Sequence, residues 1–429
     1  HGFVTLDEWE WEIINHPVFQ RLRRIRQLSL TDMVYPAAMH TRFEHSLGVM
    51  QVATRMFDQI REKREAFLES ELHFNKDGLG RDRALVRLSC LLHDVGHAPF
   101  SHAAEGLMDK DTSTGKTYKH ENYSAAAVAF LMQDVIENHP INQNYHIKAK
   151  DIADFLNGDS SVGRSLLWRN LVSSQLDADR ADYLLRDSHH IGVAYGHYDL
   201  NRLIATLTVA IDPETTSPVL AIEEGGEHAA EALIIARYMM FTQVYFQRTR
   251  RAYDRHSVEA IKHLLSDHQS QTSLSNKSAF PPPTNKDNVE DYLKWDDWRV
   301  LGLIRENKAG EHGSIIMDRK HHRAVFETPE VPTLEDQELA KEIENALGTD
   351  IGFIDCASSS WYKFESADVP ILLRPGKEDE TLTTLSACSP VVNGLKPIER
   401  TRIYVPLDKR KRAEEIVTRT RSEKENAHD

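Results

Sequence analysis

The sequence predicts a mainly α fold, in which an all-helical body is followed by a smaller α/β C-terminal region. Three observations support this prediction. Apolar residues recur at helical spacing through most of residues 7–264, the stretch 266–288 is polar with three consecutive prolines, and short strand-like runs alternate with helices beyond it. The chain has 429 residues, enough for one large core and one or two appended modules.

The body is predicted from amphipathic segments taken in chain order. The predicted helices are FEHSLGVMQVATRMFDQIREKREAF at 43–67, RALVRLSCLLHDV at 83–95, NYSAAAVAFLMQDVI at 122–136, LDADRADYLLRD at 176–187 and EHAAEALIIARYMMFTQVYFQ at 227–247. Residues 207–224 interrupt them as a β-hairpin around a turn rich in Pro and Thr.

The C-terminal region is predicted to mix both types of element. We expect a helix near 289–306, strands in AVFET, IGFIDCA and RIYVPL, and a charged helix at about 408–424. The predicted organisation is therefore a helical domain at 1–265, a linker or loop at 266–288, and an α/β region at 289–429 that packs on the domain.

Composition and charge exclude several classes of protein. With 40% hydrophobic and 28% charged residues, and no apolar run near the length of a membrane span, we expect a soluble, cytoplasmic protein without membrane association. Nothing at the N-terminus resembles a signal peptide, and because the chain opens at His1 we expect trimmed native sequence upstream. Cys90, Cys356 and Cys388 are expected to be reduced thiols.

The net charge of −14 argues against a protein that coats nucleic acid, so nucleic acid is not expected as the main partner. Positive charge is nevertheless concentrated in three runs, RLRRIR at 21–26, QRTRRAYDR at 247–255 and DKRKR at 408–412. We expect the last of these to be a solvated face.

The most informative stretch is LLHDVGHAPFSH at 91–102, which holds three histidines and an aspartate. Gly96 and Pro99 break the preceding helix, so His93 and Asp94 are predicted in its last turn. Imidazole and carboxylate are suitable ligands for a first-row cation, and a shared metal offsets the cost of burying them. Further ligands are expected from His45 and from one of three aspartates, Asp177, Asp179 or Asp182.

Four ordered motifs together resemble a known family. HTRFEHSLGV, LLHDVGHAPFSH, KHEN and LDADRADYLLRDSHHIGV are similar to the motif set of the HD-domain phosphohydrolases, and more closely to the deoxynucleoside triphosphate (dNTP) triphosphohydrolases. HGFVTL and NHPVFQRLRRIRQLS match that branch as well, and the resemblance covers about residues 1–265. It implies an all-helical HD domain.

The resemblance also implies a role for individual residues. One divalent transition metal (Fe, Mn, Zn, Ni or Co) is held by His45, His93, Asp94 and Asp179, and Mg²⁺ on the substrate phosphates is allowed. The histidines beside the scissile phosphate are His97, His102 and His120. The implied phosphate-binding groups are Arg42, Arg180, Arg237 and Tyr183. The sugar 3'-hydroxyl is held by Gln27 and Asp187, and Tyr245, with Leu28 nearby, packs under the 2' carbon.

The expected reaction is metal-dependent hydrolysis of a dNTP, dGTP among them, to deoxynucleoside and tripolyphosphate. A metal polarises phosphate and activates water, while a histidine can give or take a proton. We assign His102 that acid/base role, with His97 as the alternate. By resemblance the enzyme is expected to be a homo-oligomer, a dimer or tetramer, and an allosteric nucleotide is allowed, with RLRRIR placed for it.

Two other function classes stay open. A phosphodiesterase or exonuclease of the same fold would act on oligonucleotides or a cyclic nucleotide with the same metal. Cyclic nucleotide phosphodiesterases usually bind a second metal, for which His97, His102 and His120 could be ligands. In the other class, the module binds nucleotides or a partner as a non-catalytic sensor. The products of the reaction separate these classes.

Overall fold

The computed structural model describes residues 2–269, 278–359, 368–377 and 379–428. The helices of the body are α1 (Glu8–Asn15), α2 (Pro17–Gln20), α3 (Arg42–Ser70), α4 (Lys76–Leu92), α5 (His120–Leu131), α6 (Gln133–Glu137), α7 (Ala149–Asn157), α8 (Leu166–Arg169), α9 (Ala178–Ile191), α10 (Leu200–Thr206), α11 (Glu227–Met240) and α12 (Arg248–Gln269). The later helices are α13 (Lys286–Leu293), α14 (Asp297–Arg305), α15 (Gly310–Met317), α16 (Leu334–Leu347), α18 (Leu385–Cys388), α19 (Pro390–Asn393) and α20 (Arg410–His428). The strands are β1 (Leu207–Ile211), β2 (Pro218–Glu223), β3 (Arg323–Glu327), β4 (Phe353–Ser359), β5 (Pro370–Leu373), β6 (Thr381–Thr384) and β7 (Ile398–Val405).

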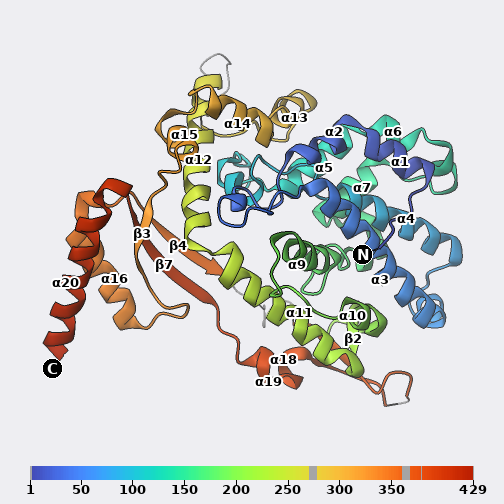
Figure 1. The fold of residues 1–429 in the computed structure, drawn as a ribbon. Coiled ribbons are helices and arrows are strands. Elements are labelled where there is room, and N and C mark those ends of the chain that lie inside the picture. The colour runs from blue at the N-terminus through green and yellow to red at the C-terminus, as the bar shows by residue number, and fades with distance from the viewer. Residues whose placement is uncertain (1, 270–277, 360–367, 378, 429) are drawn as a thin grey trace.

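The helical body is organised around the long helix α3, which packs on α4 and α9 (Figure 1). A capping box between Thr41 and Glu44 starts this helix, which satisfies the backbone groups exposed at its first turn. Gly48 allows the close approach of α9, because a Cβ at this position would overlap the carboxylate of Asp182. The three helices therefore bring the motifs HTRFEHSLGV, LLHDVGHAPFSH and LDADRADYLLRDSHHIGV next to one another.

Helices α13, α14 and α15 pack on the body rather than on the C-terminal sheet. Tyr292 of α13, Ile304 of α14 and Trp295 between these helices share one apolar cluster with Phe100 and Tyr253. The single helix predicted at 289–306 is wrong in detail, because Asp296 caps a new helix by accepting a hydrogen bond from Arg299 N.

The C-terminal lobe is a three-stranded antiparallel sheet in the order β3–β7–β4, with α16 and α20 packed together beside it (Figure 1). A second sheet, in the order β1–β2–β5–β6, extends the predicted hairpin. Strand β5 joins β2 in parallel through the pairs Ile222↔Ile371 and Glu223↔Leu372. This pairing links segments far apart in sequence, and local patterns could not predict it.

The predicted fold class is confirmed, with a helical body and a smaller sheet-containing C-terminal region. The predicted linker at 266–288 lies partly outside the described residues, and the domain limits stay a prediction. Within the described residues, no helix has both the length and the apolar character that crossing a bilayer requires.

Candidate active site

The turn after α4 is fixed against α5 by a chain of hydrogen bonds. Helix α4 ends at Leu92, so His93 occupies its C-cap and Asp94 lies one residue beyond, whereas the sequence predicted both in the last turn. Gly96 N donates to Ser124 Oγ (2.9 Å), and Ser124 Oγ donates to His93 O (2.6 Å). A Cβ on Gly96 would lie 2.6 Å from His120 O, so glycine is required where this turn meets α5.

The chain then reverses direction at Phe100 and Ser101, which both adopt left-handed backbone conformations (φ 58° and 57°). The buried carboxylate of Asp297 holds this reversal, since it accepts hydrogen bonds from Phe100 N (2.7 Å) and Arg26 N (2.8 Å). Burial raises the pKa of Asp297 to about 7. The reversal directs His102 back toward His97, and strained non-glycine residues of this kind are common at functional sites.

The four arginines of the basic run at 21–26 contact other residues of the chain, although only Arg21 is buried. The buried guanidinium of Arg21 donates to His97 O (2.9 Å) and Val95 O (3.3 Å). Arg24 pairs with Asp296, Arg26 pairs with Asp32, and Arg23 lies over the ring of Phe43. This segment therefore supports the loop that carries His97.

Side chains of the kinds that bind metal ions meet between α3, the end of α4 and α9. His45, His93 and Asp94 are buried, and their ligand atoms all lie within 4.8 Å of one another. Asp179 borders this group, with its Oδ1 atom 3.0 Å from His45 Nε2 and 3.9 Å from His93 Nε2. The structure thus brings together all four residues of the predicted ligand set.

The donor atoms suit a divalent transition metal. The Nε2 atoms of His45 and His93 are buried and make no hydrogen bond with any described residue. Burial disfavours a charged His45, but the surrounding carboxylates of Asp179, Asp182 and Asp94 outweigh it and raise the pKa of His45 to about 10. The carboxylates of Asp94 and Asp179 therefore create a potential that favours a cation beside the buried Nε2 atoms of His45 and His93.

The three aspartates left open by the sequence occupy different positions. Asp179 faces both histidines, whereas Asp182 Oδ2 lies 2.8 Å from the opposite nitrogen of His45, Nδ1, and also accepts from Arg186 (2.8 Å). Asp177 caps α9 through Arg180 N and pairs with the Arg180 guanidinium. Asp182 is thus placed to orient His45, as carboxylates beside metal-binding histidines do.

Asp182→Asn is expected to weaken metal binding by about 10- to 100-fold, because an amide orients and polarises the His45 ring less well than a carboxylate. Metal titration followed by elemental analysis measures the change. Asp58→Asn, a half-exposed carboxylate on the outer part of α3, is the control. Unchanged affinity in Asp182→Asn would contradict the orienting role.

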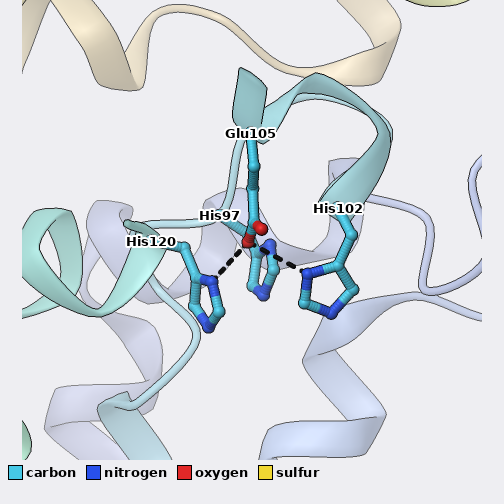
Figure 2. A group of neighbouring side chains, drawn as sticks. All are labelled: His97, His102, Glu105 and His120. Carbon is cyan, nitrogen blue, oxygen red and sulfur yellow. Dashed lines mark hydrogen bonds and ion pairs between the residues drawn. The ribbon is translucent and has the colours of Figure 1, made fainter. Parts of the chain in front are cut away.

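His97, His102, Glu105 and His120 form a second cluster (Figure 2). It adjoins the first at Asp94, whose Oδ1 atom lies 3.3 Å from His97 Nε2. Glu105 Oε1 is 3.0 Å from His102 Nδ1 and 2.5 Å from His120 Nδ1. The His97 ring stacks on the His120 ring with centroids 3.8 Å apart. Because Glu105 engages both Nδ1 atoms, the Nε2 atoms of His102 and His120 remain available to a substrate.

Burial and nearby charges shift the pKa values of Glu105, His97 and His120 in this cluster. Burial disfavours the charged form of Glu105, but His102 and His120 outweigh it and hold the pKa of Glu105 well below its ordinary value. Burial likewise opposes a charged His120, yet the hydrogen bond to Glu105 raises the pKa of His120. Burial, with Arg42 and His120 nearby, lowers the pKa of His97 well below its ordinary value. His97 is therefore neutral, while His120 favours the protonated form.

Both clusters open on one cavity of about 260 Å³. Of the predicted site residues, those that line it are Gln27, Arg42, His93, Asp94, His97, His102, His120, Asp179, Arg180 and Tyr183. His45, Leu28, Asp187, Arg237 and Tyr245 do not line it. Tyr245 nevertheless lies near its wall, with the ring centroid 6.1 Å from that of Tyr183.

Several residues at the site escaped the sequence reasoning. Glu105 is the main one, although its position three residues after His102 was a usable signal. The cavity is also lined by Glu121, Phe155, Leu156, Arg169, Val172 and Ser173. Phe155, Leu156 and Arg169 come from α7 and α8, whose sequences carry no recognisable motif.

Two family models match this chain. Residues 42–187 match the family model of the HD domain, and residues 198–280 match that of the HD associated region. YwfO, an uncharacterized protein of Bacillus subtilis, is 29% identical over 95% of this chain and 91% of its own length.

Two further relatives carry functional names. SAMHD1 of Gallus gallus, a deoxynucleoside triphosphate triphosphohydrolase, is 32% identical over 48% of this chain and 35% of its own length. A solved structure of a phosphohydrolase from Bacteroides thetaiotaomicron has a TM-score of 0.69 and 25% identity, covering 94% of this chain and 97% of that one.

Proposed function

Because this chain belongs to the HD-domain phosphohydrolases, with an HD domain at 42–187 and an HD associated region at 198–280, we propose that it hydrolyses dNTPs to deoxynucleoside and tripolyphosphate. The observation that carries the proposal is the shared cavity, on which the group of His45, His93 and Asp94 and the cluster of three histidines and Glu105 both open. The likeness to SAMHD1 over the HD part supports a dNTP as substrate.

We assign the metal to His45, His93, Asp94 and Asp179. A divalent transition metal held there supplies Lewis acidity toward a phosphate oxygen and lowers the pKa of water. Asp94 also accepts a hydrogen bond from Arg42 (2.5 Å), so the guanidinium and the ligand set hold each other in place. Mg²⁺ on the substrate phosphates is compatible with this assignment, and the identity of the resident metal is left to elemental analysis.

His102 is the proposed general acid for the leaving 5' oxygen. Its Nδ1 atom is held by Glu105, and its side chain is 63% exposed, so its Nε2 atom can reach a substrate in the cavity. His97, the alternate, is buried, and neither ring nitrogen has a hydrogen-bond partner among the described residues. A neutral, buried His97 is better suited to contact the phosphate than to donate a proton.

Arg42, Arg180, Arg237 and Tyr183 are the proposed phosphate-binding groups. Arg42 donates to Ser101 Oγ as well as to Asp94, and Arg180 is anchored by Asp177. Guanidinium groups that are already held in position lose little side-chain entropy when an anion binds. Burial raises the pKa of Tyr183 to about 12 despite the nearby arginines, so its hydroxyl remains a donor.

The sugar is proposed to lie against Gln27, Asp187 and Tyr245, with Leu28 in the adjoining core. The Oε1 atom of Gln27 is buried and has no hydrogen-bond partner in the described part of the chain. A hydroxyl such as the sugar 3'-OH would donate to this oxygen. Tyr245 is the last residue of a π-helical turn at Phe241–Tyr245. Its ring offers an apolar face to the 2' carbon.

Assays with each dNTP and rNTP test this assignment. We expect dGTP to be preferred over GTP by roughly 10- to 100-fold in kcat/KM, because an unpaired 2'-hydroxyl costs about 1 to 3 kcal/mol. Tyr245→Ala is expected to reduce the difference in kcat/KM between dGTP and GTP, mainly by improving rNTP turnover. Tyr245→Phe retains the ring and is expected to retain most of this difference. Equal kcat/KM values for dGTP and GTP in the wild type would contradict the exclusion of the 2'-hydroxyl by Tyr245.

A second candidate is a phosphodiesterase or exonuclease with two metals. The observation that favours it is the position of Asp94 Oδ1, which lies 3.3 Å from His97 Nε2 and 4.0 Å from His120 Nε2, between the two clusters. Metal stoichiometry and assays on oligonucleotides and cyclic nucleotides test this candidate. About two metals per chain together with nucleoside monophosphate products would favour it over the dNTPase.

We also propose that the enzyme is a cytoplasmic homo-oligomer, a dimer or tetramer, that is open to activation by nucleotides. The role suggested for the run at 21–26 has less support, because its four arginines make internal contacts. Mixing dNTPs in the assay and measuring mass in solution address both points.

A further inference from the structure

His40 connects the residues on the sugar side of the site. It lies in the segment before α3 and is 3% exposed. Its Nε2 atom is 2.7 Å from Asp187 Oδ1, and the other oxygen, Oδ2, accepts a hydrogen bond from the hydroxyl of Tyr245 (2.6 Å). Because an ionised carboxylate only accepts hydrogen bonds, the Nε2 atom of His40 carries the hydrogen and donates.

The backbone of His40 contributes to the same arrangement. Its carbonyl oxygen accepts from Gln27 N (3.0 Å), and Arg42 N donates to Ile25 O (2.9 Å). The segment that carries Gln27 is therefore paired with the segment that carries His40. One residue thus fixes Gln27 through its backbone and Asp187 through its side chain.

The His40 ring has little freedom to turn. It stacks on the ring of His190, with centroids 4.3 Å apart and an interplanar angle of 9°. Its second nitrogen, Nδ1, is buried and has no hydrogen-bond partner among the described residues. Burying an unpaired polar atom costs stability, so a residue that only filled space would be better replaced by an apolar one.

We propose that His40 is a positioning residue that sets sugar recognition. The inference rests on the proposed function, in which Asp187 holds the 3'-hydroxyl and Tyr245 excludes the 2'-hydroxyl. The His40 hydrogen bond fixes the carboxylate plane of Asp187, which keeps its remaining lone pairs available to the 3'-hydroxyl. Asp187 in turn holds the Tyr245 hydroxyl, so loss of His40 weakens 3' recognition and 2' exclusion together.

The test compares dGTP, 2',3'-dideoxy-GTP and GTP in the metal-loaded enzyme of residues 1–429. In the wild type, removal of the 3'-hydroxyl is expected to lower kcat/KM by roughly 10- to 100-fold, mainly through KM. In His40→Ala the same removal is expected to cost less than about threefold, with a parallel fall in the dGTP/GTP ratio. His40→Gln places an amide N–H near the original Nε2 position and is expected to restore both preferences, whereas the shorter His40→Asn is not.

Controls separate this role from a general loss of structure. Metal content and thermal unfolding show that each variant is folded, and His190→Ala removes the stacked ring without removing the hydrogen bond to Asp187. His190→Ala is expected to retain the sugar preferences, and an equal loss there would overturn the assignment to the hydrogen bond.

The outcomes also distinguish the inference from the proposed function. If the wild type hydrolyses dNTPs and folded His40→Ala retains wild-type 3' dependence and dGTP/GTP ratio, only the role of His40 is overturned. If the wild type hydrolyses no dNTP, the proposed function and this inference both fail.

Discussion

Asp179→Ala is expected to remove bound metal and turnover together while leaving the fold intact. The Asp179 side chain is 36% exposed and faces His45 and His93, so its loss removes a ligand without leaving a hole in the core. Elemental analysis of the purified variant is expected to fall from about one metal per chain to near zero, with activity at background. Full metal occupancy in Asp179→Ala would exclude Asp179 from the ligand set.

Asp94→Ala is expected to lose the metal as well, but with a cost in stability. Asp94 is buried and pairs with the buried guanidinium of Arg42, and breaking a buried ion pair costs about 3 to 5 kcal/mol. Asp177→Asn is the matched control for both variants, since asparagine also caps helices and Asp177 lies beside the group without facing the histidines. It is expected to retain both metal and fold.

His102→Ala is expected to lower kcat by roughly 10² to 10⁴ while metal and substrate remain bound. The reason is the loss of the proposed proton donor for the 5' oxygen. A p-nitrophenyl ester, whose leaving group needs no proton, is expected to recover much of the loss. Failure to recover would assign the proton to His97 or make His102 a positioning group.

Glu105→Gln is the companion to that experiment. It removes the carboxylate that joins His102 and His120, so a smaller loss of kcat is expected than in His102→Ala, together with a lower pKa of His120 in an NMR titration. Glu121→Gln is the matched control, because Glu121 lines the same cavity but lies farther from His120, at 3.5 Å. Its effect on both quantities is expected to be small.

The sequence predicted those parts of the site that lie within short motifs. His93 and Asp94 are adjacent in the chain, and the helical pattern of 176–187 corresponds to α9, which carries Asp179 and Asp182 and is capped by Asp177. Periodicity alone could not separate Asp179 from Asp182, because that distinction depends on which nitrogen of His45 each one faces. Only the packing of α3 against α9 decides it.

Other parts of the structure depend on contacts between distant segments. Strand β5 joins β2 across most of the second half of the chain, and Asp297 of α14 holds the loop that carries His102. His40 is a buried histidine that follows the largely apolar run MVYPAAM at 33–39, and nothing in its neighbourhood indicates that it reaches Asp187. Such long-range hydrogen bonds carry no local periodicity, so sequence patterns do not reveal them.

The most direct test of the proposed function is an analysis of the products of dNTP hydrolysis by the metal-loaded enzyme. Each dNTP, alone and in mixture, is incubated with the protein, and the nucleoside and phosphate products are separated by ion-exchange chromatography. We predict deoxynucleoside and intact tripolyphosphate in equal amounts, with no product in Asp179→Ala. Deoxynucleoside monophosphate with pyrophosphate, or no turnover of any dNTP, would contradict the proposal.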